Sequence, residues 1–131
     1  MKKYLAALMV VGIIAMTGCS CHKKETLHFD SDSFALTQED RMELDRAATK
    51  LSKKEEQRVR IYGYADSTGT KAHNKKLSMA RAHAAAAYLE GRGVNANRIT
   101  VAAFGEEHPT ASNKTKEGRR ENRRVEIQFY R

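Results

Sequence analysis

The residues with the clearest chemical potential lie in one short segment, residues 61–82. Asp66 stands in a turn that contains Gly69, and Arg81 follows later in a segment with helical character. A carboxylate accepts hydrogen bonds from an ammonium group, and a guanidinium offers a planar pair of donors to a carboxylate. An acid and a base at the two ends of one strand-turn-helix unit therefore suit a zwitterionic ligand, which carries a free amine beside a free carboxylate.

A polar stripe accompanies this pair. Asn74, Ser78 and Arg81 recur at i, i+4 and i+7, so they share one face of the predicted helix. Asn74 can both donate and accept a hydrogen bond, which suits it to fixing the orientation of a ligand. The alternative needs no ligand: Asp66 and Arg81 form an intramolecular salt bridge, and Asn74 caps the start of the helix. Spacing alone favours this alternative.

Hydrophobic periodicity identifies the elements that position these residues. Apolar residues at every second position predict strands over 26–31, 59–64, 99–103 and 125–129. Residues 105–122 read as a loop with room for a short helical turn. The order βαβαβ(α)β predicts an α/β (α+β) fold, a two-layer sandwich in which helices pack on one mixed four-stranded sheet.

Two helices are predicted between the strands. Thr37 is expected to be the N-cap of the first, with Glu39 and Asp40 in its first turn. Its buried face is expected to consist of Leu44, Ala47, Ala48 and Leu51. The second helix is predicted over 71–90 and ends at Gly91 and Gly93. Its apolar stripe is expected to be Leu77, Ala80, Ala84 and Ala87, with Tyr88 at the edge.

The first residues have the pattern of an export signal. Lys2 and Lys3 precede an apolar run from Leu5 to Met16, which is too short to span a bilayer comfortably. The run leads into Met16-Thr17-Gly18-Cys19, which resembles the lipobox of bacterial lipoproteins, whose cysteine is lipidated and becomes the new N-terminus. The alternatives are an ordinary apolar anchor and a plain secreted protein.

This reading divides the chain into three parts. Residues 1–18 are predicted to be a lipoprotein signal peptide, 19–26 a lipidated tether beginning at Cys19, and 27–131 a single folded domain. Ser20 follows the cysteine, whereas an Asp there would resemble the signal for retention in the inner membrane. We therefore expect the lipid to anchor the chain in the outer membrane, facing the periplasm.

Composition excludes several function classes. The chain carries 24 Lys and Arg against 16 Asp and Glu, a net charge of +8, which attracts anions of any kind. Nucleic acid is not an expected partner, because aromatic residues do not alternate with the basic ones and the leader exports the chain.

A lipidated Cys19 leaves Cys21 as a lone thiol. Cys19, Cys21 and His22 make a poor metal site, so neither a metal nor a cofactor is predicted.

Nothing in the sequence indicates catalysis. The 5 histidines are scattered, and neither an HExxH helix nor a Ser or Cys nucleophile motif occurs. We therefore predict that the protein is not an enzyme. A competing class is a module that docks to another envelope protein, in a secretion, motility or Tol-like complex, and uses no ligand pocket.

Three segments carry a family resemblance. The first matches the pattern TDxxGxxxxNxxLSxxRA with Ala65-Asp66-Ser67-Thr68-Gly69, Asn74, Leu77-Ser78 and Arg81-Ala82. Residues 113–126 match NxTxxGRxxNRRVE, and residues 29–33 resemble an FDFDS opening. The chain thus resembles the OmpA-like C-terminal domain, the peptidoglycan-binding module of the peptidoglycan-associated lipoproteins. The resemblance covers residues 27–130.

The resemblance implies non-covalent binding of the stem peptide of peptidoglycan, centred on its diaminopimelate residue. In that family the turn aspartate and the helix arginine hold the zwitterionic end of this residue. Carried over, these are Asp66 and Arg81, with Asn74 and Asp32 as neighbouring contacts. Arg123 and Arg124 are expected to be mainly structural.

The sequence departs from the family pattern at three places. Ala65 replaces the usual Thr and removes a hydroxyl, and Ser31 replaces an aromatic residue beside Asp32. Ala103-Phe104-Gly105 stands where the family often has Gly-aromatic-Gly. None of these changes removes a charged anchor, so they bear on affinity more than on the kind of ligand.

Overall fold

The computed structural model describes residues 23–131. The predicted signal peptide, the lipidation of Cys19 and the fate of Cys21 lie outside this range. The chain forms the following elements in order: β1 (Lys24–His28), α1 (Gln38–Lys53), β2 (Arg58–Gly63), α2 (Lys71–Gly91), a 3-10 turn (Ala96–Arg98), β3 (Ile99–Ala103), α3 (Lys116–Asn122) and β4 (Arg124–Tyr130). In the described range no helix is both long and apolar enough to cross a membrane.

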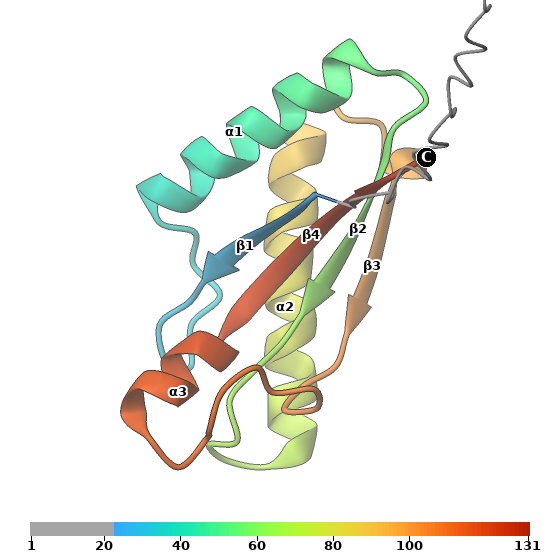
Figure 1. Cartoon of the computed structure of the whole chain (residues 1–131). Coiled ribbons are helices and arrows are strands. Elements are labelled where there is room, and N and C mark those ends of the chain that lie inside the picture. The colour runs from blue at the N-terminus through green and yellow to red at the C-terminus, as the bar shows by residue number, and fades with distance from the viewer. Residues whose placement is uncertain (1–22) are drawn as a thin grey trace, which may run out of the picture.

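The strands form one mixed sheet in the order β1-β4-β2-β3. The central strand β4 runs antiparallel to both β1 and β2, whereas β2 and β3 are parallel. The long helix α2 crosses behind the sheet, α1 lies beside it, and α3 sits at the end where β1 finishes (Figure 1). This architecture confirms the predicted α+β sandwich.

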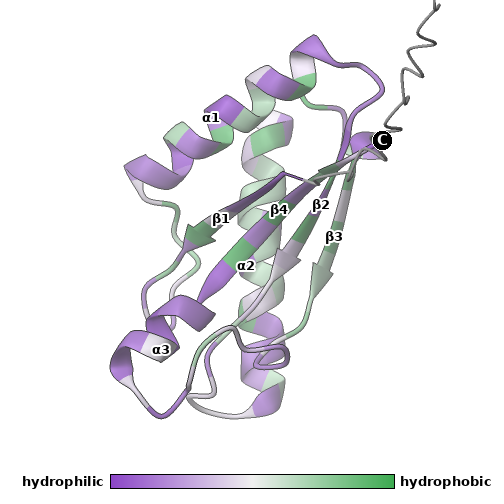
Figure 2. Ribbon diagram, in the orientation of Figure 1, coloured by the Kyte–Doolittle hydropathy of each residue, from purple (hydrophilic) through white to green (hydrophobic). Residues whose placement is uncertain are grey.

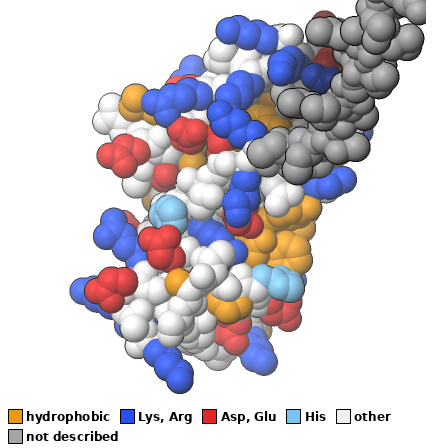
Figure 3. Space-filling model, viewed as in Figure 1, with side chains coloured by type: hydrophobic (Ala, Val, Ile, Leu, Met, Phe, Trp, Pro, Cys, Tyr) orange, Lys and Arg blue, Asp and Glu red, His pale blue; other side chains and the backbone are white. Residues whose placement is uncertain are grey.

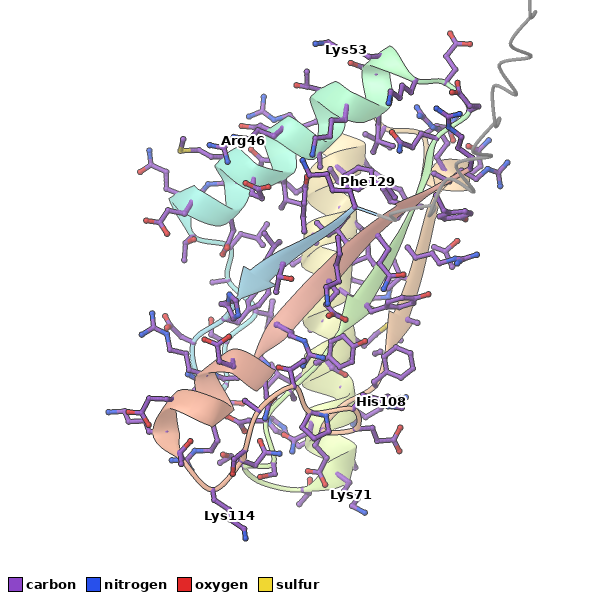
Figure 4. All side chains as sticks on the ribbon, viewed as in Figure 1. Arg46, Lys53, Lys71, His108, Lys114 and Phe129 are labelled. Carbon is purple, nitrogen blue, oxygen red and sulfur yellow. The ribbon has the colours of Figure 1, made fainter. Side chains whose placement is uncertain are left out.

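The core lies between the sheet and the two long helices. Val59 and Ile61 of β2 are fully buried, as are Val125 and Ile127 of β4, in the alternation that the sequence predicted. Phe129 lies where the sheet meets α1 and α2 (Figure 4). Apolar colour accordingly runs along the strands and over α2, whereas α3 is mostly hydrophilic (Figure 2).

Helix α1 forms as its sequence predicts. Thr37 is the N-cap in a capping box: its hydroxyl accepts the N–H of Asp40, and its backbone N–H donates to the carboxylate of Asp40. The predicted apolar residues all face the core: Leu44, Ala47, Ala48 and Leu51. Glu39 and Asp40 in the first turn and Lys50 and Lys53 in the last turn complement the helix dipole.

The expected apolar stripe of α2 is wrong. The helix buries Ala82, Ala85, Ala86 and Leu89, and its N-terminal half buries the polar residues Asn74, Ser78 and Arg81. The polar stripe is therefore the face that points inward. The helix backbone passes so close to β2 that a Cβ on Gly63 would lie 1.9 Å from the carbonyl oxygen of Ser78. Backbone carbonyls of the neighbouring loops need hydrogen-bond donors on this face of the helix, and Arg81 supplies them.

Two further boundaries differ from the sequence prediction. The first strand begins at Lys24 and ends at His28, earlier than the predicted 26–31, because Asp30 to Ser33 form a turn. Within 105–122 the chain forms α3, a true helix capped by Thr115. The loop before it is held by Asn122, whose side chain bonds to the backbone of Thr110 and Ala111.

Candidate functional site

A cavity of about 240 Å³ opens at the end of the sheet where α2 begins. Its walls come from the loop after β1, the turn after β2, the first half of α2 and Arg123, the residue between α3 and β4. The lining residues are Ser31, Asp32, Asp66, Thr68, Gly69, His73, Asn74, Leu77, Arg81 and Arg123. The four residues singled out from the sequence, Asp32, Asp66, Asn74 and Arg81, thus line one cavity. Lys71 and Lys114 point outward at the same end of the molecule (Figure 4).

Asp66 is a buried carboxylate held from two sides. One oxygen accepts the backbone N–H of Thr68 at 2.8 Å, and the other lies 3.1 Å from Nη1 of Arg123. Burial opposes ionisation, yet these bonds from Thr68 and Arg123 outweigh it and hold the pKa of Asp66 below its ordinary value. Gly69 permits the turn, because its φ of 82° lies in the left-handed region. Asp66 is therefore ionised at neutral pH.

Arg81 is fully buried at the base of the cavity. Its Nε donates to the carbonyl oxygen of Ser33 at 2.7 Å, Nη1 to that of Tyr64 at 3.1 Å, and Nη2 to that of Asp30 at 2.9 Å. Three of the five guanidinium hydrogens are thus used, which leaves two for another acceptor. Arg81 therefore ties the loop after β1 to the end of β2.

The charge of Arg81 is not matched by a carboxylate. Among the described residues no Asp or Glu lies within 4.0 Å of its nitrogens. Burial and the charge of Arg123 lower its pKa to about 10, and nearby Asp66 and Asp32 partly oppose this shift. The guanidinium remains protonated at neutral pH. A buried cation without an ion-pair partner suits a ligand carboxylate.

The intramolecular Asp66–Arg81 salt bridge that spacing favoured is wrong. Arg123 takes the place of Arg81 as partner of Asp66, and its Nε also donates to the carbonyl oxygen of Phe29 at 2.8 Å. Arg123 thus has the structural contacts expected of it and a place in the cavity wall that the sequence reasoning undervalued. Its neighbour Arg124 points elsewhere, with its guanidinium 3.8 Å from the ring centroid of Tyr64.

Asn74 does not cap the helix, so that part of the alternative is also wrong. The N-cap is Thr70, whose hydroxyl accepts the N–H of His73. Asn74 is buried in the first turn, and its side-chain amide donates to Glu106 at 3.1 Å. Its orientation is therefore fixed before any ligand arrives.

Asp32 and His73 face each other at the cavity's mouth. The carboxylate of Asp32 lies 2.7 Å from Nε2 of His73, and both side chains are exposed. Asp32 has a φ of 53°, a left-handed conformation that Asp tolerates better than most residues. The sequence reasoning missed His73, although its place next to Asn74 in the first turn of α2 was a usable signal.

Metal binding has no support within residues 23–131. The described range holds no group of three or more His, Cys, Asp and Glu side chains that could bind an ion. The weak candidate formed by Cys19, Cys21 and His22 lies outside that range.

Comparisons with known proteins agree with the geometry. The family model described as "OmpA family" matches residues 28–123. The chain belongs to the OmpA family. It is 44% identical over 101 residues to Outer membrane protein A of Bordetella avium, covering 77% of this chain and 52% of that protein. It is also 44% identical over 99 residues to the Peptidoglycan-binding protein ArfA of Mycobacterium bovis, covering 76% of this chain and 30% of that protein.

A solved structure supports the same assignment. The peptidoglycan-associated lipoprotein from Burkholderia pseudomallei superposes with a TM-score of 0.78 at 26% identity, over 80% of this chain and 89% of that one. The chain spans about half or less of the length of the two curated relatives. The activity of those whole proteins is therefore not assigned to this chain.

The departures from the OmpA-family pattern can now be placed. Ser31 is exposed where it lines the cavity, so the wall beside Asp32 lacks the aromatic ring seen in the family. Ala65 is buried, and its N–H donates to the carbonyl oxygen of Gly105. Phe104 stacks on Tyr64 with ring centroids 5.3 Å apart, away from the cavity wall. These substitutions leave the charged residues of this OmpA-family site in place.

Proposed function

We propose that the protein is an outer-membrane lipoprotein that binds peptidoglycan non-covalently through the diaminopimelate residue of the stem peptide. It would thereby link the outer membrane to the cell wall. One observation carries the proposal: Asp66 lines the same cavity as the buried Arg81, which has no carboxylate partner among residues 23–131. The names of the two peptidoglycan-associated relatives, ArfA and the Burkholderia lipoprotein, support the choice of polymer.

The charges of the cavity suit the free end of diaminopimelate. Its ammonium group would donate to Asp66, which is ionised and already oriented by Thr68. Its carboxylate would accept from the unused hydrogens of Arg81 and from Arg123. Asn74 and Asp32 would contact the neighbouring parts of the ligand. A lysine stem peptide lacks this second carboxylate, so it leaves the buried cation uncompensated and binds much more weakly.

The direct test is calorimetric titration of muropeptides that contain either diaminopimelate or lysine. We expect wild-type protein to prefer diaminopimelate, and Asp66→Ala to weaken that binding by about 2–5 kcal/mol, because an ammonium would then be buried unpaired. Glu55→Gln, a change of charge on an exposed turn away from the cavity, serves as the matched control. Equal binding of the two muropeptides would refute the diaminopimelate assignment.

Arg81, the second proposed ligand contact, needs a conservative substitution. Arg81→Ala would remove three internal hydrogen bonds as well as a ligand contact, so a loss of binding could reflect local unfolding. Arg81→Lys keeps the charge but loses the planar fork. We expect weaker diaminopimelate binding with an unchanged circular dichroism spectrum. The mass of the bound muropeptide should also be unchanged, because no catalysis is proposed.

The membrane anchor has its own test. Cys19→Ala should abolish incorporation of labelled palmitate and release the protein from membranes. Ser20→Asp should move the lipidated protein from the outer-membrane to the inner-membrane fraction. The docking-module alternative predicts instead that Asp66→Ala leaves the cellular function intact, so a complementation assay with that variant separates the two functions.

A further inference from the structure

A groove of about 630 Å³, larger than the proposed ligand cavity, lies beside the outer edge of β1. The start of α1 lies on one side of the end of β1, and α3 lies on the other (Figure 1). The groove and the cavity share no lining residue. A partner in the groove would therefore leave the diaminopimelate site unoccupied.

The groove is acidic although the chain is basic overall. Its carboxylates come from the loop after β1, from α1 and from α3: Asp30, Glu39, Asp40, Glu43, Glu117 and Glu121. Only Arg120 and His28 among its lining residues are basic, and His28 already faces Glu121 at 3.4 Å. In the space-filling view acidic side chains lie on this side of the molecule among Lys and Arg side chains (Figure 3). Six acids thus surround one hollow of a chain with a net charge of +8, although Asp40 already accepts the N–H of Thr37 and Glu43 pairs with Arg46.

The floor of the groove is a strand edge with which no strand of residues 23–131 pairs. β1 is the outer strand of the sheet, and its pairing with β4 continues at both ends through Phe29 N–H to Arg123 and Phe129 N–H to Lys23. In an antiparallel ladder alternate residues face the partner. The backbone groups of Thr26 and His28 therefore point outward, and both residues line the groove. An exposed edge of this kind accepts an added strand.

We propose that the groove binds an extended segment of a partner protein that adds a strand to β1 and carries Lys or Arg at every second position. Backbone hydrogen bonds to Thr26 and His28 supply the pairing. Side chains that alternate along the added strand bring its cations to the acidic walls. Five residues of such a segment span roughly 17 Å, the length of β1 itself.

Two other occupants fit less well. The acids do not converge on one point, since no group of three in the described range could hold a metal ion, so spaced charges match them better than a single cation. A second copy pairing β1 with β1 would place the same acidic patch on both sides of a symmetric interface. Like charges would then face each other, which disfavours that dimer.

The test uses the full chain, purified in a neutral detergent, and the peptide acetyl-Lys-Val-Lys-Thr-Lys-Val-Lys-Thr-amide. Two-dimensional NMR should show saturable shifts of the Thr26 and His28 amides. The same peptide with every backbone nitrogen methylated keeps every charge but has no N–H left to pair, and it should bind about tenfold more weakly or worse. Equal binding of both peptides would reduce the groove to a general polycation surface and overturn the proposal.

Protein variants separate the edge from the charges. Thr26→Pro removes one outward N–H without breaking the ladder to β4, and it should weaken peptide binding about fivefold to tenfold. Glu39→Gln with Glu117→Gln should weaken it about threefold to tenfold, whereas Glu55→Gln should change nothing. Muropeptide binding, measured on each variant, verifies the fold.

Two results would contradict the proposal. One is the lack of saturable binding at peptide concentrations of about 1 mM, where even weak specific complexes form. The other is a shift of the same Thr26 and His28 amides with protein concentration alone, which would assign the edge to a second copy of this chain.

Discussion

The cavity and the groove use charge in opposite ways. In the cavity Arg81 and Asp66 are 0% and 5% exposed, and each is fixed by hydrogen bonds to backbone atoms. In the groove Glu121 and His28 keep 61% and 43% of their side-chain surface exposed. The cavity therefore offers charges that are fixed by hydrogen bonds and partly desolvated, whereas the groove offers hydrated charges.

This difference teaches what each region can recognise. Charges held in a low-dielectric site interact strongly and tolerate little error in geometry, so they select one ligand shape. Exposed charges gain little per pair and are screened by salt, so they attract a class of partners and rely on the strand edge for register. Four predictions follow this contrast from the strongest effect to the weakest.

Removing the buried arginine should have the largest effect. Arg81→Met leaves the carbonyls of Ser33 and Tyr64 without the donors that Arg81 supplies and leaves that of Asp30 with the N–H of Ser33 alone, so we expect the free energy of unfolding to fall by about 3 kcal/mol or more. Urea denaturation followed by circular dichroism measures it. Arg92→Met is the control, because Arg92 makes its ion pair with Asp45 on the surface, and its midpoint should barely move. Similar losses for both variants would abolish the contrast between buried and exposed charge.

Breaking the ion pair inside the cavity should have the next largest effect, and it should depend on pH. The pKa of Asp66 is depressed in the folded state, so its contribution to stability is present above the ordinary value of 3.8 and is lost as the pH falls towards the folded value. Arg123→Gln removes the ion-pair partner of Asp66, so the pKa of Asp66 is lowered less in this variant. We expect a loss of about 2 kcal/mol at pH 7 that shrinks in strong acid to the part contributed by the bond from Nε of Arg123 to the carbonyl oxygen of Phe29, which does not depend on pH.

The measurement is the free energy of unfolding of both proteins between neutral pH and strong acid. Glu126, whose pKa is also lowered, serves as an internal reference because Lys24 and Arg124 remain in both proteins. A difference that stayed constant across the acid range would show that Arg123 stabilises the fold through Phe29 alone.

Salt concentration should have a smaller effect on ligand affinity, and this effect should differ between the cavity and the groove. Raising NaCl from about 50 to 500 mM shortens the screening length to a few ångströms, so the affinity of the lysine peptide for the groove should fall about tenfold. Muropeptide affinity for the cavity should change by less than about threefold, because its charges are shielded from solvent. Titrations of both ligands into the same protein preparation at the two salt concentrations test this. Equal losses of affinity would show that the charges of both sites are screened by salt to the same extent.

The sequence predicted those parts of the fold that local chemistry decides. Alternation located the strands, and Thr37 followed by two acids located the start of α1, because each pattern depends on residues that are neighbours in the chain. The four proposed site residues line one cavity, while their roles towards a ligand stay predictions.

The parts that the sequence did not predict depend on distant segments. Helix α2 carries alanine on almost every face, so hydrophobicity could not select the buried one, and Leu77 and Ala80 were chosen wrongly. The acceptors of Arg81 come from the loop after β1 and the end of β2. The partner of Asp66 comes from the last strand's start, so neither pairing is visible in spacing along one helix.

The exposed pair at the cavity's mouth should have the smallest effect. His73→Ala frees Asp32 from its only described side-chain partner, and because both groups are hydrated we expect muropeptide affinity to change by less than about threefold. Calorimetric titration of muropeptide into His73→Ala and into Asp66→Ala compares the exposed pair with the buried carboxylate. A loss in His73→Ala as large as that in Asp66→Ala would make the exposed pair a principal anchor, and burial would no longer explain which charges of the cavity hold the ligand.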